Sequence, residues 1–185
     1  MERKIKRVER KLVYAGSILD IYSDTMELPD GTRQNWDFVS HRKGAACVVA
    51  VTEDQQVIMV RQYRPALDRE TIELPAGCRD SNTEDTLITA KRELEEETGY
   101  TSDEIVPLLK LKSTVAFCNE FIDVYLAKNV YKKGKQHLDP EEAINIEIYS
   151  VDKLCEMIYD GIIQDSKTVS GIMAYKNLIN KNKNH

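Results

Sequence analysis

The sequence feature that most restricts the fold is the continuous apolar run from Ala45 to Val51, AACVVAV. A run this short and unbroken is typical of a central β-strand that is buried on both faces. A polar turn follows at 53–56, and residues 57–60 (VIMV) are expected to form the next strand. Strand and helix patterns then follow without a regular βαβ alternation. We therefore expect an α+β fold with a mixed β-sheet flanked by helices.

The remaining elements of this domain follow from hydrophobic periodicity and from turn residues. Further strands are expected at 106–112, 121–127 and 144–150. Helices are expected at 84–98, 151–160 and 166–180. The last two helices are expected to close the domain.

The N-terminal part of the chain has the pattern of an antiparallel β-region. Residues 11–28 alternate loosely between apolar and polar side chains, as one or two strands would. Pro29 and Gly31 mark a turn, because Pro presets φ and Gly accepts a positive φ. Residues 35–42 are expected to be the return strand of a hairpin or meander. We therefore divide the chain into an N-terminal β-region (1–43), a main domain (44–180) and a polar tail (181–185).

The helix at 84–98 has the clearest boundaries. Thr83 is a plausible N-cap, and Gly99 is expected to end the helix. An apolar stripe that can bury against the sheet runs along one side and consists of Leu87, Ala90 and Leu94.

Three carboxylates stand beside this stripe. Glu93, Glu96 and Glu97 are spaced i, i+3 and i+4, so they share one helix face. At ~4 Å, like charges repel by about 1 kcal/mol in water and by more at a lower dielectric. A divalent cation would remove this repulsion, and oxygen ligands suit Mg²⁺ or Mn²⁺. Arg92 is placed to pair with one carboxylate. Glutamate-rich helices are also common as solvated faces without a ligand, so the spacing alone leaves both interpretations open.

Composition limits the partners of the chain. The net charge is −5 and the sequence pI is near 5.3, whereas a general nucleic-acid binder is usually basic. We find no apolar signal segment and no stretch near the ~20 apolar residues that cross a bilayer. The four cysteines are dispersed and form no CxxC pair, which favours a reduced, cytoplasmic setting. We therefore expect neither a nucleic-acid nor a membrane partner.

The stretch from Gly77 to Tyr100, GCRDSNTEDTLITAKRELEEETGY, resembles the Nudix signature. That signature is a Gly and a spaced Glu, followed by Arg-Glu-apolar-x-Glu-Glu-x-Gly-apolar, and the second half matches at every specified position. One departure is that six residues, not five, separate Gly77 from Glu84. The extra residue falls in a loop, where an insertion costs little. The resemblance implies a Nudix-like α/β/α sandwich that hydrolyses a diphosphate linkage.

The resemblance also implies roles for individual residues. It assigns Glu93, Glu96 and Glu97 as ligands of Mg²⁺, with Mn²⁺ as an alternative, together with the backbone carbonyl of Ala76. Glu84 is expected to support the loop, and Arg92 is expected to orient the carboxylates as part of the catalytic set. This agrees with the chemistry of bound metals, which polarise a phosphoryl group and lower the pKa of an attacking water.

The flanking segments resemble the ADP-ribose pyrophosphatase branch of the family. The matching segments are VRQYRP at 60–65, IELPAG at 72–77, KGAA at 43–46 and DGIIQDSKT at 160–168. The likeness covers about residues 12–178 and implies hydrolysis of ADP-ribose to AMP and ribose 5-phosphate. The branch has Pro near Val115, followed by Gly, and this chain has neither. A nucleotide-sugar diphosphatase and a non-catalytic Nudix-type nucleotide-sensing module therefore remain alternatives, although a sensor need not keep three glutamate ligands.

Two residues outside the signature are expected at the substrate. By resemblance, Arg64 contacts a phosphate or ribose oxygen; the alternative is an exposed ion pair. Trp36 is expected to stack on adenine, with ordinary packing as the alternative. Relatives in this branch are homodimers whose N-terminal strands reach the partner. Residues 1–43 are therefore expected to serve dimerisation and substrate contact, and Trp36 to act in the neighbour's site.

The base that activates water is expected in a loop outside the signature. Glu142, and after it Glu141, precede the strand INIEIYS at the position where relatives place such a residue. A capping or solvated acid pair is the alternative, and Glu120 is a third candidate. His41 and His137 are expected at the surface, with no role in a metal site.

Overall fold

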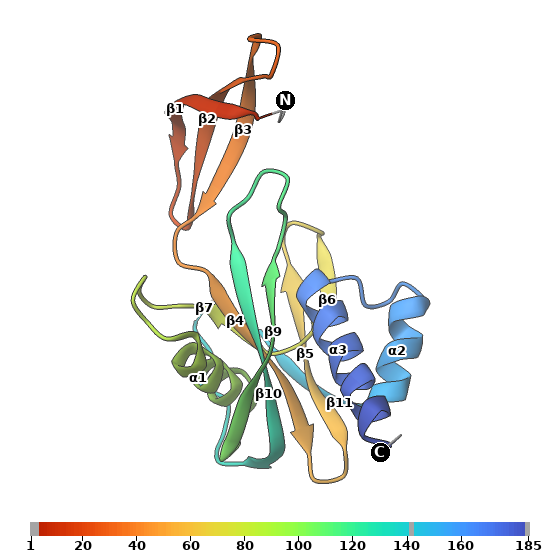
Figure 1. Cartoon of the computed structure of the whole chain (residues 1–185). Coiled ribbons are helices and arrows are strands. Elements are labelled where there is room, and N and C mark those ends of the chain that lie inside the picture. The colour runs from red at the N-terminus through yellow and green to blue at the C-terminus, as the bar shows by residue number, and fades with distance from the viewer. Residues whose placement is uncertain (1–3, 141–142, 184–185) are drawn as a thin grey trace.

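The computed structural model describes residues 4–140 and 143–183. Figure 1 shows a three-stranded sheet at the N-terminus that stands apart from a larger body. The strands of this antiparallel sheet are β1 (Lys6–Ala15), β2 (Leu19–Glu27) and β3 (Arg33–His41). The predicted N-terminal meander is thus confirmed, with a first strand that begins five residues earlier than the alternation indicates.

The body is built on one mixed sheet. Its strands are β4 (Ala45–Thr52), β5 (Gln56–Arg64), β6 (Arg69–Glu73), β7 (Ala76–Cys78), β8 (Tyr100–Thr101), β9 (Glu104–Lys112), β10 (Phe121–Lys132) and β11 (Asn145–Ser150). They run in the order β11-β5-β4-β10-β8, with β6 on β5, β7 on β4 and β9 on β10. β4 and β10 are parallel, and the other pairings are antiparallel. The sequence did not indicate β6, β7 or β8, because strands this short show no clear periodicity.

Helices cover both faces of this sheet (Figure 1). They are α1 (Thr86–Thr98), α2 (Val151–Tyr159) and α3 (Ser166–Lys183). Alternate residues of β4 point to opposite sides. Val49 packs in the core beneath α2 and α3, whereas Val48 packs with Ala90 and Leu94 of α1. The prediction that 45–51 is a central strand buried on both faces is confirmed.

Three helix boundaries differ from the prediction, and one of them, the end of α2, differs by a single residue. α1 begins at Thr86 rather than at residue 84, because Asp85, not Thr83, caps it by accepting a hydrogen bond from the Leu87 N–H at 2.9 Å. Gly99 ends this helix as predicted, with φ 71°. α3 continues to Lys183, three residues beyond the predicted end, so part of the expected tail is helical.

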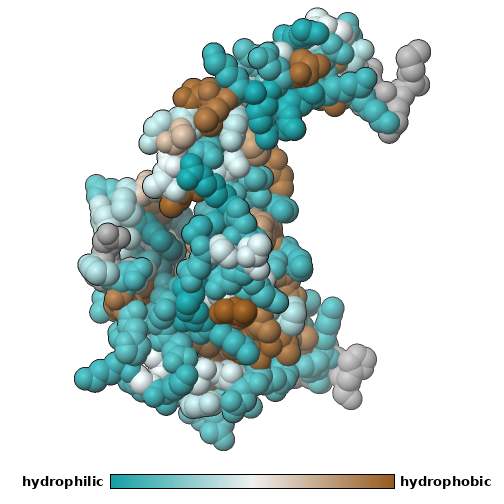
Figure 2. Space-filling view, turned by 90° about the vertical axis from the view of Figure 1, so that its left-hand side faces the viewer, coloured by the Kyte–Doolittle hydropathy of each residue, from teal (hydrophilic) through white to brown (hydrophobic). Residues whose placement is uncertain are grey.

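The N-terminal sheet is attached to the body through the loop between β9 and β10. The Val39 N–H donates to the Phe117 carbonyl at 2.7 Å, and the His41 N–H donates to Asn119 Oδ1 at 2.8 Å. The sheet leaves many large apolar side chains exposed, and Figure 2 shows apolar patches on it. These side chains are Ile5, Val8, Leu12, Val13, Tyr14, Ile18 and Trp36 on the strands and their flanking residues. Within the described ranges, every helix is too short or too polar to cross a bilayer.

Candidate active site

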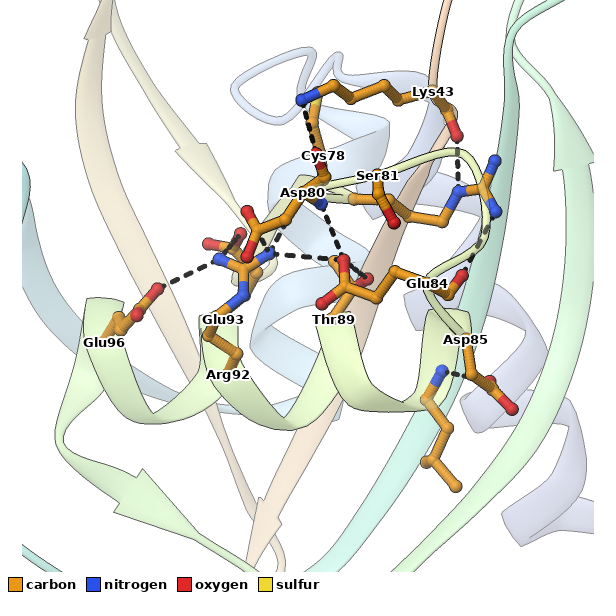
Figure 3. A network of polar contacts seen from close by, with 12 residues as sticks. Lys43, Cys78, Asp80, Ser81, Glu84, Asp85, Thr89, Arg92, Glu93 and Glu96 are labelled. Carbon is orange, nitrogen blue, oxygen red and sulfur yellow. Dashed lines mark hydrogen bonds and ion pairs between the residues drawn. The ribbon is translucent and has the colours of Figure 1, made fainter.

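Arg92 connects α1 to β7 through hydrogen bonds (Figure 3). Its Nη1 donates to Glu93 Oε1 at 2.7 Å and to Glu96 Oε2 at 3.1 Å, and its Nη2 donates to the Cys78 carbonyl at 2.9 Å. One planar guanidinium thus fixes two carboxylates relative to β7. Removing it would leave two like charges on neighbouring turns without a shared partner.

Two of the signature glutamates, Glu93 and Glu97, contact β7 directly. Glu93 and Glu97 are buried, with 9% and 3% of their surfaces exposed. Glu97 Oε2 accepts a hydrogen bond from the Ala76 N–H at 2.9 Å. The carboxylate of Glu93 lies against Gly77, where a Cβ would come within 2.1 Å of Oε1. The fold therefore brings Ala76, Glu93 and Glu97 together, while Glu96 is more exposed and joins them through Arg92.

The oxygen donors at the β7–α1 junction are of the kind that a hard cation prefers, but they do not surround an ion by themselves. Among residues 4–140 and 143–183, no three acidic, histidine or cysteine side chains converge closely enough to enclose an ion by themselves. The available donors are carboxylates on one helix face and backbone carbonyls of β7. Mg²⁺ commonly takes only one or two protein carboxylates and completes its shell with water and substrate phosphate. An open set of oxygen donors fits such an ion.

The loop before α1 accommodates the extra residue because several hydrogen bonds pin it. Glu84 Oε2 accepts from the Asp80 N–H at 2.7 Å and from Thr89 Oγ1 at 2.9 Å. The Asp80 N–H is the main reason that the pKa of Glu84 lies below its ordinary value. Lys43 Nζ donates to the Asp80 carbonyl at 2.7 Å, and Arg79 donates to the carbonyls of Lys43, Asn82 and Glu84. The resemblance implies that Glu84 supports the loop, and its contacts have that form.

Arg64, the residue expected to contact substrate, forms an ion pair with a buried carboxylate. Its Nε and Nη2 donate to the two oxygens of Glu73 at 2.7 and 2.6 Å, and Glu73 is only 2% exposed. Glu73 also accepts from Thr71 Oγ1 at 2.6 Å and from Lys167 Nζ at 2.5 Å. Burial alone would raise the pKa of Glu73, but the hydrogen bonds from Arg64 and the charge of Lys167 outweigh it and lower the pKa to about 2.

Sequence reasoning missed this cluster, although a signal was present. Glu73 is a charged residue within the apolar segment IELPA. A buried carboxylate needs a partner, so a buried position for Glu73 would have predicted nearby cations. Arg64, Glu73 and Lys167 line a cavity of about 390 Å³ together with Ala66, Leu67, Arg69, Thr71, Gln164 and Asp165.

Trp36 lies far along β3 from the residues around α1. Its side chain is 43% exposed beside a cavity of about 210 Å³ that the β9–β10 loop helps to line. His41, five residues further along the strand, has Nε2 at 3.9 Å from Cys78 Sγ. Five residues of extended strand span roughly 16 Å. Within one chain, Trp36 is therefore distant from the β7–α1 junction.

Of the three candidate bases, Glu120 alone lies in the described part of the chain. Glu141 and Glu142 lie outside the described residues. Glu120 Oε1 is 3.7 Å from His41 Nε2, and the Gly44 N–H donates to His41 Nδ1 at 3.1 Å. The His41 side chain is only 12% exposed, so its expected surface position is wrong; it is packed against Cys78 and the β9–β10 loop. His137 is exposed, as expected.

Comparison with known proteins agrees with this architecture. The NUDIX domain family model matches residues 41–170. The chain is 34% identical to a methanol dehydrogenase activator of Bacillus methanolicus over 90% of each chain. It is 32% identical to an ADP-ribose pyrophosphatase of Bacillus subtilis, again over 90% of each. A crystal structure of an ADP compounds hydrolase superposes with a TM-score of 0.85 at 17% identity, covering 98% of this chain and 96% of that one.

A mixed sheet between helices, with a glutamate-bearing loop–helix on one face, defines the class of α/β/α sandwich proteins. The chain belongs to the Nudix family, since the family model covers more than half of it. It is a Nudix hydrolase acting on diphosphate linkages, and this family generally depends on a divalent metal. The predicted fold and enzyme class are therefore confirmed.

Proposed function

We propose that this chain hydrolyses ADP-ribose to AMP and ribose 5-phosphate in the presence of Mg²⁺. The observation that carries the proposal is the convergence of Ala76, Glu93 and Glu97 at the β7–α1 junction. Similarity to the Bacillus subtilis ADP-ribose pyrophosphatase over nine tenths of the chain supports the choice of substrate.

In this proposal Glu93, Glu96, Glu97 and the Ala76 carbonyl hold Mg²⁺, or Mn²⁺ in its place. The bound ion would supply polarisation of the diphosphate and acidify a water molecule. Arg92 keeps Glu93 and Glu96 in position through its two Nη1 hydrogen bonds. Proton removal is assigned to Glu142, with Glu141 and Glu120 as the other candidates.

Substrate binding is assigned to Arg64 and Trp36, and the active form to a homodimer. Trp36 is half-exposed and distant from the β7–α1 junction of its own chain, which suits action in a partner's site. The N-terminal sheet supports this assembly, because it projects from the body and exposes a series of apolar side chains (Figures 1 and 2). The division at residue 43 would then separate a dimerisation region from the catalytic domain. The proposed compartment is the cytoplasm, which suits four free cysteines.

The test is hydrolysis of a panel of nucleoside diphosphate compounds with Mg²⁺ and identification of the products. Preference for ADP-ribose, with AMP and ribose 5-phosphate as products, supports the proposal. Preference for a nucleotide sugar would retain diphosphate hydrolysis but change the substrate, consistent with the unusual β9–β10 loop at 113–120.

A sensing role is the second candidate, and similarity to a methanol dehydrogenase activator is the observation that favours it. Such a role predicts ADP-ribose binding without turnover. Equilibrium dialysis alongside the hydrolysis panel separates the two functions, because an enzyme consumes the ligand and a sensor returns it intact.

A further inference from the structure

Lys167 is a buried lysine whose position the chemistry at α1 does not explain. Only 9% of its surface is exposed, and it lies at the beginning of α3, far along the chain from the signature helix. Its Nζ donates to Glu73 Oε2 at 2.5 Å and to Asp165 Oδ2 at 2.9 Å. Burial of a lysine is costly unless its charge is fully paired, so this position requires both acids.

The same carboxylate that binds Lys167 also orients Arg64. Glu73 Oε2 is shared by Lys167 Nζ and Arg64 Nη2, and Oε1 is shared by Thr71 Oγ1 and Arg64 Nε. Arg64 is therefore held along its Nε–Nη2 edge. Within the described part of the chain, its Nη1 makes no hydrogen bond to protein, which leaves donors on the other edge for a ligand.

Within the hydrogen-bonded cluster of Arg64, Glu73, Asp165 and Lys167, the charges balance only if Lys167 is counted; Arg69 also lines the cavity but donates to Gln164 and to the Glu70 carbonyl. Glu73 and Asp165 contribute two negative charges, and Arg64 and Lys167 contribute two positive charges. Without Lys167, Arg64 would be the one cation of this cluster beside two carboxylates. The positive charge of Arg64 would then be neutralised by these carboxylates. A diphosphate anion would meet a cavity that is more negative by one charge.

Backbone contacts connect this cluster to the β7–α1 junction. The Leu74 N–H donates to Thr168 Oγ1 at 3.0 Å, and Thr168 Oγ1 donates to Asp165 Oδ2 at 2.6 Å. Two residues further along, the Ala76 N–H binds Glu97. The short segment 73–76 thus fixes the distance between the Arg64 cluster and the carboxylates of α1.

We propose that Lys167 is a positioning residue for substrate binding, which acts through Glu73 to keep Arg64 oriented and available to the diphosphate. This inference rests on the proposed function, because it takes Arg64 as a substrate contact. An ordered, only partly neutralised arginine binds an anion without a further loss of side-chain freedom. Loss of Lys167 should therefore weaken substrate binding more than it slows the chemical step.

The experiment compares Lys167→Met with Lys176→Met in steady-state hydrolysis of ADP-ribose. Lys176 is a matched control, because it lies on the same helix and pairs with Asp152 of α2 away from the cavity. We expect Lys167→Met to raise KM about tenfold, or about 1.4 kcal/mol, with kcat changed less than threefold. Lys176→Met should leave both constants unchanged. An unchanged KM for a folded Lys167→Met protein, or a loss confined to kcat, would overturn the proposal.

A double-mutant cycle tests whether the effect passes through Arg64. If it does, Arg64→Met and Arg64→Met/Lys167→Met have the same KM, because Lys167 no longer has an arginine to position once Arg64 is replaced. Additive effects would contradict the relay. If Lys167→Met does not fold, Thr71→Val serves instead: it removes one hydrogen bond to Glu73 without changing any charge, and KM should rise about threefold. An unchanged KM for a folded Thr71→Val protein would also count against the relay.

The outcomes also separate this inference from the proposed function. If wild type cleaves no ADP-ribose, the proposed function fails. If wild type cleaves it and Lys167→Met behaves as wild type, only the role of Lys167 fails.

Discussion

The carboxylate of Glu93 occupies the space beside the Cα of Gly77 that a side chain would need. An ideal Cβ on Gly77 would lie 2.1 Å from Glu93 Oε1 and 2.2 Å from its Cδ. This close approach explains in physical terms why a glycine opens the signature motif. Any side chain at residue 77 would have to displace the Glu93 carboxylate from its place beside the strand.

Replacing Gly77 by Ala should therefore displace Glu93 and impair catalysis. A misplacement of about 1 Å at a catalytic group costs on the order of 100-fold in rate, and we expect kcat to fall by about that factor. Gly134→Ala is the matched control, because a Cβ at Gly134 meets no atom within 4 Å. A Gly77→Ala enzyme with wild-type kcat would show that the position of Glu93 is not critical.

Arg92→Met should lower kcat at least about tenfold, because Glu93 and Glu96 lose their shared donor and repel each other. Lys91→Met, an exposed change on the same helix, should leave kcat within twofold of wild type. The measurement is kcat for ADP-ribose at saturating Mg²⁺, with thermal unfolding to verify folding. Equal kcat values for the two variants would remove Arg92 from the catalytic set.

The sequence was sufficient to predict the layered fold and the signature helix, because both depend on local patterns. The apolar run 45–51 indicates a strand with both faces covered, and the i, i+3, i+4 spacing of the glutamates requires only helix geometry. The first residue of α1 was harder to predict. Thr83 and Asp85 are both good caps, and the choice depends on Glu84 turning back to the Asp80 N–H, which is a feature of the folded loop.

Contacts between distant segments could not be predicted in this way. Lys167 and Glu73 are 94 residues apart and meet only because the first turn of α3 lies against the end of β6. The same holds for His41, which lies near Cys78 because β4, the strand that follows it, pairs with β7. Neither pairing leaves a periodic trace in the sequence.

Glu73 should make stability depend on pH in the acid range. Its pKa is lowered from 4.5 to about 2 in the folded protein, so its stabilising contribution is present above pH 4.5 and is lost as the pH falls from 4.5 towards 2. The contribution is about 3 kcal/mol. Denaturant unfolding of wild type should show this loss across that window, whereas Glu73→Gln should show a shallower dependence. Parallel profiles for the two proteins would contradict a strongly paired Glu73.

Trp36→Ala should raise the KM for ADP-ribose about tenfold, the loss expected from one base–aromatic stack, and should change kcat by less than twofold. Tyr159→Ala is a suitable control, because Tyr159 is an aromatic residue on α2 that is 78% exposed. Steady-state kinetics check the split between KM and kcat. An unchanged KM in Trp36→Ala would assign Trp36 to packing rather than to stacking.

The most direct test of the account is kcat of Glu97→Gln beside Glu95→Gln, with ADP-ribose and titrated Mg²⁺. Both glutamates lie on α1, but Glu97 is buried against Ala76, whereas Glu95 pairs with Lys133 at the surface. Metal assistance is worth several kcal/mol, so Glu97→Gln should lose on the order of 100-fold or more in kcat. Glu95→Gln should retain wild-type activity. Equal activity of the two variants at every Mg²⁺ concentration would contradict a catalytic metal held by the signature helix.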